Sequence, residues 1–199
     1  MNKAWELNQK IEECLRTYTT EKVEPYFEHL NIGDGRDVEY YRETHSEEEH
    51  PKGIYRYLAC AVKVLKPKIV VELGADRGAS ALVMESELPK NGKIYSIDQR
   101  DGWEYVPKKS KIVKLLGDSI DTYLLKDINL NNVDLWFIDS EHNEDTVRLE
   151  YATYSPYWHK GTVIMFDDID LYYPVWLDIP FDKYESKEIH GQNFGVIKV

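Results

Sequence analysis

Five short apolar segments alternate with helix-like segments along residues 53–168, and this alternation restricts the fold more than any other feature of the sequence. Strands that alternate with helices indicate a parallel sheet with helices on both of its faces. The chain then ends in YESKEIHGQNFGVIKV, two runs around a His-Gly-Gln-Asn turn, which is typical of an antiparallel hairpin. We therefore predict an α/β fold, doubly wound, with a mostly parallel seven-stranded sheet and a C-terminal antiparallel hairpin. The five apolar segments are Lys68–Gly74, Lys93–Asp98, Lys111–Asp118, Val133–Asp139 and Gly161–Asp168.

Apolar residues at helical spacing, together with Pro, Gly and Asn-Gly breaks, predict the helices between these strands. The expected helices are 53–65, 81–88, 119–128 and 144–158.

The chain has 199 residues, which is enough for one domain with a full core and short for two. Residues 53–199 contain the alternating pattern. Residues 1–52 are polar and helix-prone, and we expect them to form a helical N-terminal cap or lid. The tyrosines and histidines of this stretch fit either a lid or a solvated cap, namely Tyr40, Tyr41, His45 and His50.

The composition disfavours several classes of partner. A formal net charge of −11 argues against nucleic acid, because phosphate contacts need a basic surface. The sequence has no apolar run near the length of a membrane span and no apolar signal region at its start, so we expect a cytoplasmic protein without a membrane partner. Cys14 and Cys60 have neither metal-site nor disulfide spacing. A homo-oligomer is compatible with the sequence.

Acidic residues gather at the ends of the predicted strands. Right-handed crossovers place the carboxyl ends of parallel strands along one edge of the sheet, where ligands of such folds bind. The sequence therefore predicts an acidic, ligand-binding edge. Its acids are Glu72, Asp98, Asp118, Asp139, Asp167 and Asp168.

The segment VVELGADRGAS follows the pattern of a ligand-binding turn between a strand and a helix. Glycines allow a ligand close to the backbone, and the helix start offers N–H donors. The spacing E-x-G-x-x-x-G differs from the G-x-G-x-x-G of dinucleotide folds, and an acid here suits a cationic group such as an amino acid's amine. A tight strand–helix turn without a ligand is the alternative. The candidate residues are Glu72, Gly74, Ala75, Gly78 and Ser80.

Two further acids extend this site. Asp98 ends the second strand, 20 residues after Gly78, where a carboxylate can accept hydrogen bonds from a ribose diol. Asp118 and Ser119 follow the third strand and could meet an adenine edge. Loop capping by Asp98 and helix capping by Asp118 are the alternatives.

The stretch VIMFDDID places two adjacent carboxylates, Asp167 and Asp168, at the end of a buried strand. Like charges repel and are costly to remove from water, so a counter-charge is needed or the pair must remain hydrated. In the second case Asp167 caps a turn and Asp168 points to solvent.

The order VVELGADRGAS, YSID, LLGDS, FIDSEH, VIMFDDI and terminal hairpin resembles the class I S-adenosylmethionine-dependent methyltransferases. FIDSEH and MFDDI are similar to motifs of small metal-dependent O-methyltransferases, including the catechol and antibiotic-sugar types. The resemblance extends from about Gly53 to Val199, and the first 50 residues have no match.

The resemblance implies S-adenosylmethionine as cofactor, held by the turn after the first strand and by Asp98. It implies a divalent metal, expected to be Mg²⁺, bound by Asp139, Asp167 and Asp168, and oxygen ligands suit such an ion. His142 stands where catechol-type enzymes have a lysine base, so Asp139 and His142 are the expected catalytic residues.

The implied substrate is a hydroxyl group of a small molecule, such as a sugar, a catechol-like compound or a secondary metabolite. A metal-independent methyltransferase and a non-catalytic relative remain alternatives. An NAD-binding oxidoreductase is a further one, disfavoured by the glycine spacing.

Overall fold

The computed structural model describes residues 2–19, 53–103 and 106–199. In this part of the chain, seven strands form one sheet in the order β3-β2-β1-β4-β5-β7-β6. Strands β1 to β5 run parallel, whereas β7 is antiparallel to both β5 and β6. The predicted α/β fold with a C-terminal antiparallel pair is confirmed. The strands are β1 (Ile69–Leu73), β2 (Lys93–Asp98), β3 (Ile112–Leu116), β4 (Leu135–Ile138), β5 (Val163–Phe166), β6 (Lys183–Ser186) and β7 (Phe194–Lys198).

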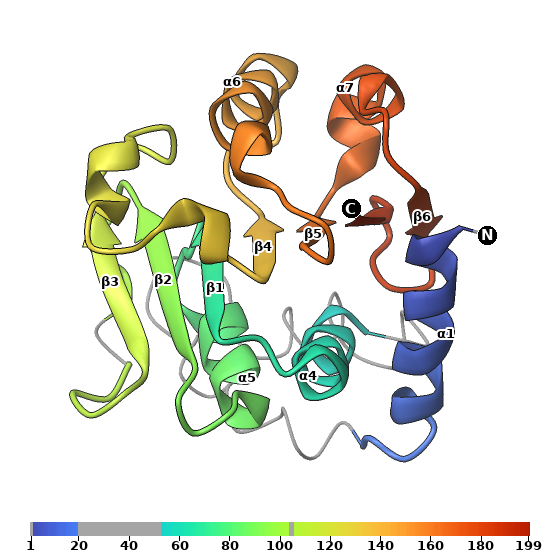
Figure 1. Ribbon diagram of the computed structural model, residues 1–199, viewed down its shortest axis with the longest axis horizontal. Coiled ribbons are helices and arrows are strands. Elements are labelled where there is room, and N and C mark those ends of the chain that lie inside the picture. Colours follow the sequence, from blue (N-terminus) through green and yellow to red (C-terminus); the bar gives the residue numbers. More distant parts are fainter. Residues whose placement is uncertain (1, 20–52, 104–105) are drawn as a thin grey trace.

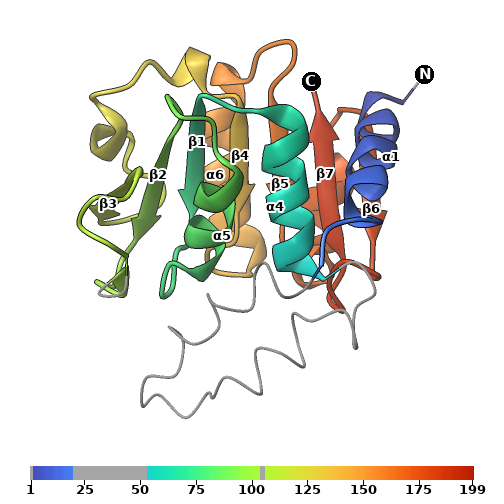
Figure 2. The ribbon, with the colours of Figure 1, turned by 90° about the horizontal axis from the view of Figure 1, so that it is seen from below.

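Helices cover both faces of the sheet (Figure 1). One layer contains α1 (Lys3–Leu15), α4 (Ile54–Leu65) and α5 (Ala79–Glu87). These three helices lie in front of the sheet when it is viewed from below (Figure 2). The opposite layer contains α6 (Glu144–Tyr154) and the short α7 (Tyr173–Asp178). The central strands are apolar along their whole length because both of their faces are covered.

Two hydrophobic clusters form the core, one on each face of the sheet. The first is built around α4, whose residues 54–62 are all buried. The second lies under α6 and α7, and in it Trp176 packs edge-on against Phe166 with ring centroids 5.7 Å apart. The aromatic segment after β5 therefore contributes to the packing of this face.

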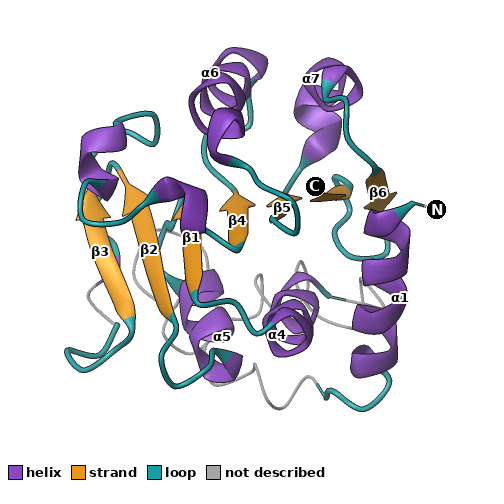
Figure 3. Ribbon diagram, viewed as in Figure 1, coloured by secondary structure: helices purple, strands orange, loops and turns teal. Residues whose placement is uncertain are grey.

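The helix expected over 119–128 is shorter than predicted. The structure forms only a 3₁₀ turn, Thr122–Leu125, capped by Asp121. Loops and short turns join the strands of the sheet at several places (Figure 3). Other 3₁₀ turns are Leu130–Asn132, Ser155–Tyr157 and Ile169–Tyr172. Short polar residues that bond to nearby backbone groups favour such turns over a regular helix.

The N-terminal helix α1 packs against α4 and against the β6–β7 edge of the sheet. Its apolar stripe includes Leu7, Ile11 and Leu15, and Asn2 caps its first turn by accepting from the Trp5 backbone N–H. The rest of the expected cap or lid, including Tyr40, Tyr41, His45 and His50, lies outside the described residues. None of the helices in the described ranges has the length and apolar character needed to cross a bilayer.

Candidate functional site

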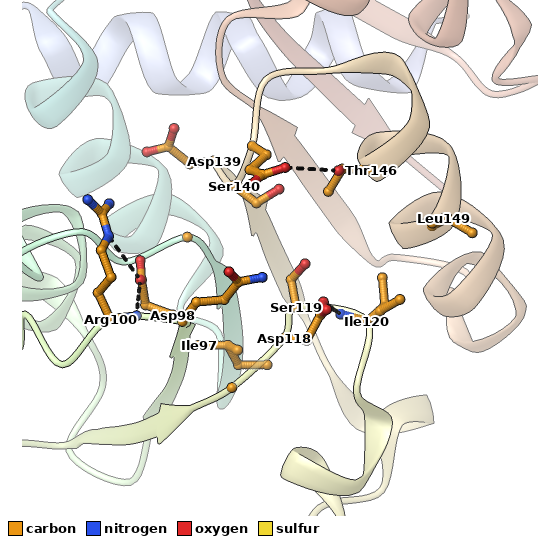
Figure 4. A pocket seen from close by; sticks show the side chains of 14 residues that line it. Ile97, Asp98, Arg100, Asp118, Ser119, Ile120, Asp139, Ser140, Thr146 and Leu149 are labelled. Atoms are coloured by element: carbon orange, nitrogen blue, oxygen red, sulfur yellow. Dashed lines mark hydrogen bonds and ion pairs between the residues drawn. The ribbon is translucent and has the colours of Figure 1, made fainter.

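The strand order places a topological switch point between β1 and β4. The chain runs outward from β1 through β2 to β3 and then returns to β4 on the other side of β1. Ligands of open α/β sheets bind outside the carboxyl ends of the strands at such a point. A cavity of about 450 Å³ lies there (Figure 4). Its lining includes five of the predicted site residues, namely Gly74, Asp98, Asp118, Ser119 and Asp139.

The turn after β1 follows the predicted path. Gly74 and Gly78 both have positive φ, +86° and +82°, a conformation that favours glycine. The Gly74 N–H donates to the Ile97 carbonyl (2.9 Å), which holds the turn against β2. Gly78 begins α5 and packs on Trp103, so it supports the turn from below the cavity. Trp103 is itself buried and donates to Ser96 Oγ.

Glu72 lies beneath this turn and does not line the cavity. Its carboxylate is fully buried and accepts hydrogen bonds from Ser80 Oγ (2.5 Å) and Ser96 Oγ. Burial raises the pKa of Glu72 to about 7, although the two serine hydroxyls oppose the shift. In this structure Glu72 and Ser80 brace β1 against β2 and α5, and a direct contact between Glu72 and a ligand stays a prediction.

Asp98 connects the turn to the cavity. Its Oδ2 accepts from the backbone N–H groups of Ala75 (3.0 Å) and Asp76 (2.8 Å), and its Oδ1 accepts from the Arg100 N–H (2.7 Å). Figure 4 shows Asp98 and Arg100 together on one side of the cavity. Each carboxylate oxygen has two lone-pair directions, so Asp98 can still accept from a ligand hydroxyl.

The loop after β3 forms another wall. Asp118 and Ser119 line the cavity, and Asp118 Oδ1 also accepts from the Ile120 N–H (3.1 Å), which closes a local turn; the helical turn that follows is capped by Asp121 instead. Thr146 and Leu149 of α6 face this loop in Figure 4. Leu149 was not predicted as a site residue. It is apolar and exposed, and its place in the cavity wall follows only from the position of α6 beside the loop after β3.

Asp139 and the tandem acids meet at the ends of β4 and β5. Ile138 pairs with Phe166 in the sheet, and the Asp167 N–H donates to the Ile138 carbonyl (3.0 Å), so the acids follow adjacent strands at the same level. Burial, then the charges of Asp167 and Asp168, raise the pKa of Asp139 well above its usual value. The three acids therefore lie near one another, but the group of ligand atoms that lie within 4.8 Å of one another contains Asp167, Asp168 and His190 and not Asp139, so Asp139 as a metal ligand stays a prediction.

His142 lies between the two groups of acids. Its Nε2 is 3.7 Å from Asp139 Oδ1 and 3.7 Å from Asp168 Oδ2. About a third of its side chain is exposed, so a substrate can reach the ring. The imidazole is therefore placed to exchange a proton beside the acids.

His190, in the loop between β6 and β7, was not predicted as a site residue. Its Nδ1 is 3.0 Å from Asp167 Oδ1 and 2.8 Å from Asp168 Oδ1. Burial alone would lower the pKa of His190, but its hydrogen bond to Asp167 and its close approach to the negative charges of both acids raise it to about 10. The predicted hairpin alone did not place His190 here; the antiparallel pairing of β7 with β5 brings the residues before β7 beside those that follow β5.

The donor set fits a divalent cation. Asp167, Asp168 and His190 each offer one ligand atom, and these atoms lie within 4.8 Å of one another. Asp168 Oδ1 is buried and accepts no hydrogen bond, although it is close to His190. A buried carboxylate oxygen without a donor is costly, and a cation would satisfy it.

Comparison with known proteins agrees with this geometry. Residues 71–169 match a family model described as a methyltransferase domain. No curated protein shows significant sequence similarity to the chain. The structure resembles the methyltransferase PaMTH1 of Podospora anserina bound to S-adenosylhomocysteine, with a TM-score of 0.62 and 12% identity over 100% of this chain and 96% of that one.

A second solved structure of similar fold is an O-methyltransferase from Bacillus cereus in complex with S-adenosylhomocysteine. Its TM-score is 0.56 and its identity 14%, over 93% of this chain and 100% of that chain. The resemblance inferred from the strand-end motifs is thus confirmed by the family match and by the fold. Residues 71–169 therefore contain a methyltransferase domain, and the chain has the fold of these two methyltransferase structures, as the resemblance to the class I S-adenosylmethionine-dependent enzymes implied.

Proposed function

We propose that the protein transfers the methyl group of S-adenosylmethionine to a hydroxyl oxygen of a small molecule and uses a divalent metal. The observation that carries this proposal is the cluster of Asp167, Asp168 and His190, whose ligand atoms lie within 4.8 Å of one another. His142 stands 3.7 Å from both Asp168 and Asp139, and Asp139 lines the switch-point cavity. The two similar structures bind the demethylated cofactor, and one of them is an O-methyltransferase.

The cofactor would occupy the cavity between the turn after β1 and the loop after β3. Asp98 is the acceptor for the ribose hydroxyls, and Asp118 and Ser119 lie where the adenine edge would fall. This arrangement leaves the sulfonium end near Asp139. Because the sulfonium is already a good leaving group, the main contribution of the chain is to hold donor and acceptor in line.

The acceptor hydroxyl would lie beside the three acids, within reach of His142. A bound divalent cation would polarise that hydroxyl and lower its pKa. His142 Nε2 would take the proton as general base, which is typically worth about 10²–10⁴ in rate. Sugars, catechol-like compounds and secondary metabolites carry suitable hydroxyl groups.

A metal-independent methyltransferase is a second candidate, favoured by one observation. The raised pKa of His190 keeps its ring positively charged between Asp167 and Asp168, which offsets their repulsion without a metal. Under this alternative, a chelator leaves methyl transfer unchanged.

Calorimetric titration tests the proposal in two steps. We expect S-adenosylmethionine or S-adenosylhomocysteine to bind and NAD not to bind; absence of heat with both sulfur cofactors would overturn the cofactor assignment.

We expect Asp167→Asn to weaken divalent-metal binding while cofactor binding remains. Asp170→Asn is the matched control, because Asp170 is three residues away and pairs with Lys187 instead.

Turnover is then measured as S-adenosylhomocysteine release with a panel of sugar and catechol acceptors. Loss of activity on chelation and its recovery with added metal would support the metal-dependent reading. His142→Gln should lower turnover without changing cofactor affinity, and His159→Gln serves as control because His159 contacts the Lys160 carbonyl away from the cavity.

A further inference from the structure

The loop between β6 and β7 is fixed against the segment that follows β5. The Ile169 N–H donates to the Asn193 carbonyl (3.0 Å), and the Asp170 N–H donates to the Gln192 carbonyl (3.0 Å). Within the loop, the Asn193 N–H donates to the His190 carbonyl (3.0 Å). These backbone bonds fix the residues that follow His190 against the segment after β5, so the position of His190 beside the tandem acids is part of the fold.

His190 cannot satisfy both acids by itself. Its Nδ1 carries at most one hydrogen, and that hydrogen bonds to Asp167 Oδ1 at 3.0 Å. Asp168 Oδ1 lies 2.8 Å from the same nitrogen but has no hydrogen bond and is buried. Charge attraction therefore holds the three groups together while one acceptor is left without a donor.

The same spacing suits a metal ion. In an octahedral site with bonds of ~2.1 Å, neighbouring ligand atoms lie ~3.0 Å apart. The distances from His190 Nδ1 to the two carboxylate oxygens, 3.0 Å and 2.8 Å, match such octahedral edges. An ion could thus replace the Nδ1 proton with little movement of the three side chains.

We propose that His190 Nδ1 is a ligand of the divalent metal, together with Asp167 and Asp168. The assignment rests on the proposed metal-dependent function and specifies its metal. Imidazole nitrogen binds Mn²⁺, Co²⁺, Ni²⁺ and Zn²⁺ better than it binds Mg²⁺, which takes oxygen ligands. The site is therefore selective for a transition metal over the Mg²⁺ expected from the sequence.

This assignment separates the roles of the two histidines. His190 is buried for most of its side chain and touches both tandem acids, whereas His142 is more exposed and stands 3.7 Å from its nearest acids. His190 holds the ion from the β6–β7 side, and His142 remains available to the substrate.

Pulsed electron paramagnetic resonance of bound Mn²⁺ tests the assignment without measuring activity. We expect modulation from a directly bound ¹⁴N nucleus in the wild type and in His142→Ala, and its loss in His190→Ala. Mn²⁺ bound by the wild type without this modulation would overturn the proposal. So would a ¹⁴N signal that survives in His190→Ala and disappears in His142→Ala.

Calorimetry with Mn²⁺ and Mg²⁺ provides a second readout. The wild type should bind Mn²⁺ more tightly than Mg²⁺, and His190→Ala should reduce Mn²⁺ affinity by at least ~10-fold while affecting Mg²⁺ less. Equal affinity of the wild type for the two ions would contradict the assignment. His190→Gln provides a second variant if the alanine variant does not fold, as judged by circular dichroism.

Titration with S-adenosylhomocysteine on the same samples separates this inference from the proposed function. Cofactor binding without the ¹⁴N signal would contradict only the assignment of His190 as a metal ligand. Absence of cofactor binding would sink the methyltransferase proposal even if Mn²⁺ is bound through His190.

Discussion

A Cβ atom on Gly74 would lie 1.9 Å from the backbone carbonyl oxygen of Asp139, so these two residues are in direct backbone contact. The contact joins the turn after β1 to the end of β4 across the switch point. Because the obstacle is backbone, it cannot move aside as a flexible side chain would. The close approach of Gly74 thereby helps to position Asp139, which lines the cavity beside the candidate metal site.

Gly74→Ala should therefore destabilise the protein by about 3 kcal/mol or more, since it adds a backbone clash to an unfavourable φ. Gly161→Ala is the control: Gly161 also has positive φ, +104°, but nothing lies within 4 Å of its added Cβ. The free energy of unfolding of the control should fall by only about 1–2 kcal/mol, the cost of placing a Cβ atom on a backbone of positive φ. Urea unfolding of both variants measures the difference, and equal losses would contradict the clash.

The strands and the acids that end them were predictable from the sequence because both depend on local pattern. Runs such as VDLWFID are apolar throughout, and a buried parallel strand requires this. Parallel topology then brings the strand ends to one edge without any knowledge of side-chain contacts. Asp98 and Asp139 were placed correctly at the cavity for this reason.

The remaining features depend on register between distant strands. Glu72 pairs with Ser96 of β2 in the sheet, and through this pairing its buried carboxylate accepts a hydrogen bond from the Ser96 hydroxyl, which the sequence did not predict. His190 reaches the tandem acids only because β7 pairs antiparallel with β5. The hairpin was predicted, but its partner strand was not, so the contact could not be read from sequence.

Asp98→Asn should weaken binding of S-adenosylhomocysteine by about 10–100-fold. The reason is the loss of a charged acceptor, since a hydrogen bond to a charged group contributes about 1.5–3 kcal/mol. Asparagine also has a single acceptor oxygen, so it cannot serve the Ala75 and Asp76 amides and the Arg100 amide together.

The matched control for this change is Asp121→Asn. Asp121 likewise accepts from a backbone amide, that of Tyr123 (3.0 Å), but lies outside the cavity lining. Isothermal titration calorimetry should give near-wild-type affinity for this control. An Asp98→Asn variant that binds as tightly as the wild type would rule out Asp98 as the ribose acceptor.

Arg56 attaches the N-terminal helix to the domain. It is buried in α4, and its guanidinium donates to the carbonyls of Tyr18 (2.9 Å) and Leu15 (3.0 Å) at the end of α1. Arg56→Ala removes these charged donors and should cost about 3 kcal/mol of stability. Hydrogen exchange should accelerate first in residues 3–15.

Lys63→Ala tests whether the effect of Arg56 is specific. Lys63 lies in the same helix, but half of its side chain is exposed and its ion pair with Glu87 spans 4.0 Å. Its ammonium also lies 5.5 Å from the centre of the Tyr18 ring. Exposed ion pairs and cation–π contacts of this kind each contribute about 0–1 kcal/mol, so exchange in α1 should change far less than in Arg56→Ala. Faster exchange in α1 for this control as well would indicate general destabilisation of α4.

The buried Glu72 makes stability depend on pH in a direction opposite to that of most carboxylates. Its pKa is about 7 in the folded protein, compared with 4.5 for an unperturbed glutamate. Between these values the folded state holds a proton that the unfolded state releases, so its stabilising contribution is complete below about pH 4.5 and is lost as the pH rises through 7. The change amounts to ~3 kcal/mol at most.

Glu72→Gln removes this titration while keeping the shape of the side chain. The free energy of unfolding, measured in urea from pH 4.5 to 8, should fall less with rising pH in the variant than in the wild type. Glu85→Gln is the control, because Glu85 also accepts two hydrogen bonds, from Ser110 Oγ and the Lys111 N–H, but is only partly buried. If the free energy of unfolding of both variants depends on pH as it does in the wild type, Glu72 is ionised in the folded protein. Its hydrogen bonds to Ser80 and Ser96 are then made by a charged carboxylate.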